Sequence, residues 1–86
     1  MLTYEDCVGL SELTEGEIEA IAEHEHIPDM AALEMGNYLV HTGAGERRLK
    51  AIIVDDIATA RASGNGQHAA VLQAVLKNFI AQHRGG

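Results

Sequence analysis

The only proline of this chain, Pro28, stands in the middle of its most regular apolar pattern and divides that pattern in two. Apolar residues recur at helical spacing on both sides. Proline disfavours helical geometry in the residue before it and suits the first turn of a new helix. A capping-box sequence, Thr14 with Glu17, precedes the first of the two stretches. We therefore expect one helix over residues 15–26 and a second over residues 29–40.

The rest of the chain carries the same kinds of signal. Thr3, followed by two acids, starts a segment of one or two helical turns, and HTGAGE indicates a loop of about five residues. Helical spacing predicts helices over 46–62 and 67–83, with SGNG as the turn between them. The residues are 47% apolar but only 3% aromatic, a composition typical of helices and not of strands. The predicted fold is all-α: a small four-helix bundle with a short extra N-terminal helix, in a single domain over 1–86 whose residues 84–86 fray.

Charge is divided unevenly along the chain. Residues 1–46 hold eleven Asp and Glu and no Lys or Arg, whereas residues 47–86 hold all six Lys and Arg and only two Asp. This asymmetry favours packing of the acidic half on the basic half, within one chain or across a homodimer. We expect Glu25, Glu34 and Asp56 to be neutralised by basic side chains of the second half, from Arg47, Arg48, Lys50 and Arg61. The acidic half disfavours nucleic acid as a partner and favours a protein with a basic surface.

No signal for a membrane or for secretion is present. No stretch approaches the roughly 18 apolar residues that a bilayer span requires, and the start of the chain lacks the basic and apolar regions of a signal peptide. We therefore expect a soluble cytoplasmic protein without membrane partners. Cys7 is the only cysteine, which excludes an internal disulfide and a two-cysteine zinc motif and predicts a reduced, at least partly buried thiol.

Three segments carry a resemblance: YEDCVGLSEL near the start, then EIEAIAEHEHIP, then GNYLVHT. In overall appearance, over about residues 3–80, the chain resembles a group of short uncharacterised bacterial proteins. The resemblance implies a bacterial protein of unknown function. It implies no activity, cofactor or site residue.

The densest group of Glu and His surrounds the first predicted long helix. Glu19, Glu23 and His26 share one polar flank of it, and Glu23 and His26 are three residues apart. If the two helices that meet at Pro28 form a hairpin, Glu34 comes back close to Glu23. Carboxylate and imidazole groups suit Zn or Fe, so the pattern predicts a metal site of Glu23, His26 and Glu34, with Glu19 in reserve. The competing interpretation is a solvated helix face.

No nucleophile, base and orienting group recur at the spacing of a catalytic site, and no glycine-rich phosphate loop follows a strand. On helical wheels, Glu25 falls in the middle of an apolar face, and Asp56 and His68 fall on the apolar stripes of the last two helices. The leading hypothesis is a homodimeric, non-catalytic protein-interaction or regulatory module without a cofactor. The alternative is a helical protein that binds Zn or Fe.

Overall fold

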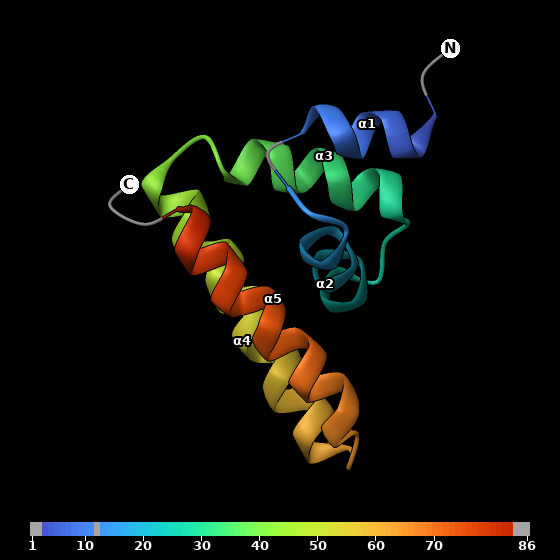
Figure 1. The fold of residues 1–86 in the computed structure, drawn as a ribbon, viewed down its shortest axis with the longest axis vertical. Coiled ribbons are helices and arrows are strands. Elements are labelled where there is room, and N and C mark those ends of the chain that lie inside the picture. The colour runs from blue at the N-terminus through green and yellow to red at the C-terminus, as the bar shows by residue number, and fades with distance from the viewer. Residues whose placement is uncertain (1–2, 12, 84–86) are drawn as a thin grey trace.

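The computed structural model describes residues 3–11 and 13–83, and all the regular secondary structure in this part of the chain is α-helical (Figure 1). The all-α prediction is therefore confirmed. The predicted fraying of residues 84–86 lies outside the described residues. The helices are α1 (Tyr4–Leu10), α2 (Glu15–Glu25), α3 (Asp29–Leu39), α4 (Gly43–Ala62) and α5 (Gly66–Gln82).

Local signals account for most of the helix ends. Thr3 and Thr14 each form a capping box: the threonine hydroxyl accepts a hydrogen bond from the third helical N–H, and the acid at that position accepts one from the threonine N–H. His26 ends α2 in the left-handed conformation, with φ of 57°, and Pro28 is the N-cap of α3. Asn65 caps α5, as its position after Gly64 predicts.

The predicted loop over HTGAGE is wrong, because α4 already begins at Gly43. Thr42 caps it by accepting a hydrogen bond from the Gly45 N–H at 2.9 Å. Gly45 is buried against the backbone of Leu39, and a Cβ atom there would overlap the Leu39 carbonyl group. The glycine thus permits a close approach between the end of α3 and the start of α4, which is a different role from ending a helix.

Helices α4 and α5 form a hairpin along the long axis of the molecule, and α1 and α3 lie across one end of it (Figure 1). Helix α2 is seen nearly end-on in this view and packs against α3, α4 and α5. The predicted four-helix bundle, in which the long helices run alongside one another, is not confirmed. At the crossing of α2 and α3, Gly36 brings α3 so close that a Cβ atom there would overlap the side chain of Leu13 and touch that of Ile21.

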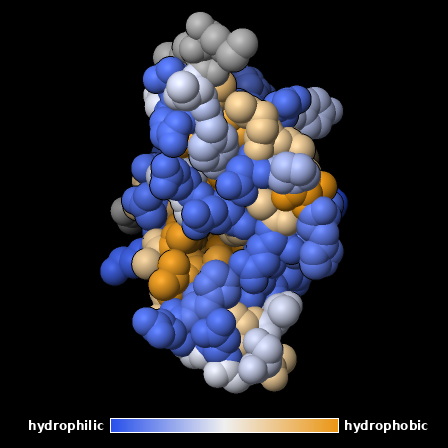
Figure 2. All heavy atoms as spheres, turned by 90° about the vertical axis from the view of Figure 1, so that its right-hand side faces the viewer, coloured by the Kyte–Doolittle hydropathy of each residue, from blue (hydrophilic) through white to orange (hydrophobic). Residues whose placement is uncertain are grey.

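The core forms where α2 meets the hairpin. Ile18 and Ile21 of α2 and Leu49 and Ile53 of α4 are fully buried. Apolar side chains also reach the surface, in patches bordered by polar residues on the face that Figure 2 shows. The large apolar residues that are most exposed are Met30, Tyr38, Val54, Val71 and Ile80. In the described part of the chain, no helix combines the length and the apolar character that a membrane crossing requires.

Candidate functional site

The structure brings two of the three predicted metal ligands to one cavity and places the third elsewhere. Glu23 and His26, at the end of α2, line a cavity against α4. Glu34 instead lines a groove between α1 and α3. The predicted hairpin of α2 and α3 is the reason for the difference: the two helices cross, so α3 does not run back along α2. Glu19, the reserve ligand, is exposed and lines neither cavity.

We call the first cavity the histidine–carboxylate pocket. It has a volume of about 510 Å³, and its lining consists of acids and histidines from α2 and its C-cap, together with residues of the middle of α4: Glu23, His24, His26, Asp55, Asp56, Ala58 and Thr59. Sequence reasoning placed Glu23 and His26 in a polar site but did not include His24 or Asp55. Their contribution depends on the packing of α2 on α4, which no local pattern reveals.

Histidine links the helices around this pocket. His24 contacts Glu25 through Nδ1 at 2.7 Å and Asp55 of α4 through Nε2 at 3.3 Å. The hydrogen bond to Glu25, followed by that to Asp55, raises the pKa of His24 above its ordinary value. His68 of α5 contacts Glu23 through Nε2 at 2.8 Å. The pocket is therefore held together by charges that α2, α4 and α5 each supply.

Asp56 is the buried acid of the pocket. Its residue surface is only 4% exposed, and its Oδ2 atom has no hydrogen-bond partner among the described residues. Burial raises the pKa of the Asp56 carboxyl to about 6, and the nearby carboxylate of Glu23 raises it further than burial alone would. The sequence-based prediction that Asp56 faces the core is confirmed.

The expected neutralisation of acids by Arg and Lys is wrong for the described residues. Every ion-pair contact there uses histidine as the basic partner: His24 with Glu25 and Asp55, His68 with Glu23, and His83 with Glu46. The basic side chains of α4 and α5 are exposed instead: Arg47, Arg48, Lys50, Arg61 and Lys77. A long flexible side chain loses conformational entropy and hydration when it is fixed beside a buried acid, whereas the shorter histidine is already placed by its helix.

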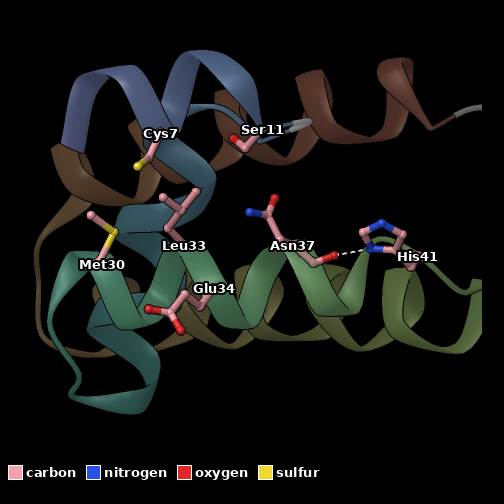
Figure 3. Close-up of a pocket in the computed structure, with 7 residues that line it drawn as sticks. All are labelled: Cys7, Ser11, Met30, Leu33, Glu34, Asn37 and His41. Carbon is pink, nitrogen blue, oxygen red and sulfur yellow. Dashed lines mark hydrogen bonds between the residues drawn. The ribbon is translucent and has the colours of Figure 1, made fainter. Parts of the chain in front are cut away.

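The second cavity, which we call the α1–α3 groove, has a volume of about 660 Å³. Cys7 of α1 points toward Met30 and Leu33 of α3, and these three form its apolar part (Figure 3). Its polar part holds Ser11, Asn37 and His41, and Glu34 completes the lining. His41 hydrogen-bonds through Nδ1 to the backbone carbonyl of Asn37 in its own helix.

The groove does not form a catalytic pair. Cys7 lies at the apolar end beside Met30, whereas His41 lies at the opposite end beyond Asn37 (Figure 3). A thiol and an imidazole activate each other only within hydrogen-bond reach. Within residues 3–11 and 13–83, no three His, Cys, Asp or Glu side chains stand close enough to hold a metal ion as they are arranged.

Acidic groups dominate the electrostatics around α1 and α3. Tyr4, at the start of α1, is half-buried, and its pKa is raised first by burial and then by the negative charges of Asp29, Glu15, Glu19 and Glu5. Glu5, Asp6, Asp29 and Glu34 are all exposed. The groove therefore opens in a negative field.

A third polar cluster, which sequence reasoning missed, lies inside the fold. Glu17 is completely buried: its Oε1 atom accepts the capping hydrogen bond from the Thr14 N–H, and its Oε2 atom has no partner in the described structure. Burial raises its pKa. His83 contacts Glu46 through Nδ1 at 3.1 Å, while its Nε2 atom is buried without a partner among the described residues. The signal was present, since Glu17 is four residues before the core residue Ile21 on the same helix face.

Comparisons with protein-family models, with curated proteins and with solved structures give no match for this chain.

Proposed function

We propose that this protein is a non-catalytic interaction module, and that its α1–α3 groove binds a protein segment in which an apolar side chain stands between Lys or Arg residues. One observation carries the proposal: the groove has an apolar part formed by Cys7, Met30 and Leu33, and it opens in the half of the chain that contains no Lys or Arg. An apolar contact surrounded by one sign of charge favours a partner of the opposite sign.

The exposed residues beside the groove support this partner chemistry. Met30 is 40% exposed and Tyr38, on the same helix, is 80% exposed, so α3 offers apolar surface to water. Methionine adapts its shape to different apolar partners, and tyrosine is enriched at protein interfaces. Glu34 and Asp29 are exposed on the same helix and can pair with basic side chains of the partner.

The test uses two synthetic helical peptides of about 18 residues with the same positive charge, one with a leucine face and one with serine in place of leucine. We expect the leucine peptide to bind more tightly in fluorescence anisotropy, and the affinity to fall as salt rises from about 50 to 300 mM. Backbone amide shifts in NMR spectra should change mainly in α1 and α3. Met30→Ser should weaken binding of the leucine peptide by about fivefold, a loss of about 1 kcal/mol, without changing the binding of the serine peptide.

The matched control is Val54→Ser, which removes an apolar side chain of similar exposure from α4. It should leave the affinity unchanged. Equal binding of the two peptides, or shifts centred on α4 and α5, would contradict a docking groove and indicate attraction to the net negative charge alone.

Homodimerisation and a cytoplasmic location stay predictions. An 86-residue chain has a small core, and Val54, Val71 and Ile80 leave apolar surface exposed on the α4–α5 hairpin that a second copy could cover. Light scattering at micromolar concentration tests the dimer, and a monomer at both low and moderate salt would contradict it.

A further inference from the structure

The histidine–carboxylate pocket holds a buried acceptor that the protein itself does not satisfy. Asp56 is 4% exposed, lines the pocket, and has no partner for Oδ2 in the described part of the chain. A buried polar atom without a hydrogen bond costs free energy, so a ligand that satisfies it gains affinity. The carboxylates of Glu23 and Asp55 lie in the same lining, so this ligand should be a cation.

Imidazole groups around the pocket narrow the kind of cation. His24 and His26 line it, and His68 approaches from α5 to contact Glu23. Neutral imidazole together with carboxylate is the donor set of zinc and related transition metals, whereas magnesium and calcium take oxygen ligands. None of the side chains that line the pocket is Lys or Arg.

The spacing between α2 and α4 fits such an ion. His24 Nε2 and Asp55 Oδ2 are 3.3 Å apart, which is long for a hydrogen bond between charged partners. Two ligand atoms of a tetrahedral zinc, with bonds of 2.0–2.1 Å, are also about 3.3 Å apart. An ion in place of the His24 proton would therefore leave these two helices at their present separation.

We propose that the histidine–carboxylate pocket binds one Zn²⁺ ion, with His24 and Asp55 as ligands from the two helices and Asp56 as the buried ligand. Binding releases to solvent the proton on His24 Nε2, which the ion replaces. The site closes by side-chain rotation: the side chain of Asp55 is 70% exposed and that of Glu23, the further carboxylate available, is 45% exposed, so neither is held by packing. This ligand set keeps one helix of the predicted site and replaces Glu34 by residues of α4.

The test is isothermal titration of Zn²⁺ into protein that carries no histidine tag and has been freed of metal with EDTA. We expect one ion per chain and a rise in melting temperature with Zn²⁺ but not with Mg²⁺. Asp56→Asn and His24→Gln should each weaken binding by about tenfold or more. The half-exposed His24 provides a variant that is expected to fold normally, which circular dichroism checks.

Matched controls come from the α1–α3 groove, which also holds a glutamate and a histidine. Glu34→Gln and His41→Gln should leave the zinc affinity unchanged. The proposal is overturned by the absence of stoichiometric binding, or by binding that survives Asp56→Asn and His24→Gln. Either result leaves the peptide-docking function of the groove intact, because that function uses none of these residues.

Discussion

The α1–α3 groove and the histidine–carboxylate pocket are built from similar residue types but differ in what their neighbours leave unpaired. In the groove, His41 bonds to the backbone of its own helix, and the surface left over is apolar. In the pocket, His24 and His68 bond to acids on other helices, and the group left over is the carboxylate of Asp56. Residue type alone therefore does not determine what a site binds. The contacts that helix packing has already satisfied determine it.

The largest expected effect comes from breaking the corner that places the two cavities relative to each other. Gly45→Ala puts a Cβ atom into the Leu39 carbonyl group, where α3 of the groove passes into α4 of the pocket. We expect a loss of about 3 kcal/mol in the free energy of unfolding, measured by urea titration, because backbone cannot move aside as a side chain can. Gly43→Ala is the control: its nearest neighbour would be Arg47 at 3.6 Å, so it should be neutral or stabilise α4 by about 0.5 kcal/mol. Equal effects of the two variants would remove the corner from the account.

A gain in stability is expected from the pocket. Asp56→Leu, studied in EDTA at about pH 7.5, removes a buried carboxylate with an unpartnered oxygen, and the adjoining cavity of about 510 Å³ gives the larger side chain room. We expect stabilisation of about 1–2 kcal/mol in urea titration. Asp55→Leu, at an exposed position beside it, should change little. A clear loss of stability in Asp56→Leu would show that Asp56 belongs to a satisfied polar network.

A smaller, pH-dependent effect distinguishes Glu17 from the acids of both cavities. Burial raises its folded pKa above the ordinary value of 4.5, so between these two values the folded chain binds more protons than the unfolded chain. Its contribution to stability therefore falls as pH rises through this window. Glu17→Gln keeps a capping-box residue at this position and removes the charge, so we expect it to stabilise the protein at neutral pH and to show no such gain below about pH 4.

Thermal melts of both proteins at a series of pH values measure this difference. Glu15→Gln, at an exposed position two residues earlier, serves as the control and should not reproduce the pH-dependent gain. A constant difference between Glu17→Gln and the parent protein across the series would contradict a raised pKa for Glu17.

Local features of the fold were predictable from the sequence, and features that depend on helix crossing were not. Thr3, Thr14 and Asn65 cap helices as expected, because a cap depends on neighbours within three residues. The glycines after Thr42 indicated a loop, but Gly45 is there for a tertiary contact. Glu34 was assigned to the wrong cavity for a related reason: the close approach at Gly36 makes α3 cross α2, and the sequence pattern contains no information on that crossing.

The candidate site was half predicted. Glu23 and His26 do share a cavity, since both depend on the spacing within one helix. The partners of the acids were predicted incorrectly because charge counting does not distinguish an exposed arginine from a histidine in contact. Glu25, expected in the middle of an apolar face, is only half-buried, and Glu17 is the acid that the core encloses.

The exposed Arg and Lys side chains of α4 and α5 also affect how the molecule approaches other molecules. Because no acid within the described residues pairs with them, their charge is not cancelled locally, and the acidic α1–α3 end faces a more basic hairpin. The protein is therefore an electric dipole, and a charged partner experiences a torque before contact. Such orientation raises the rate of productive encounter, and this advantage should disappear as salt shortens the range of the field.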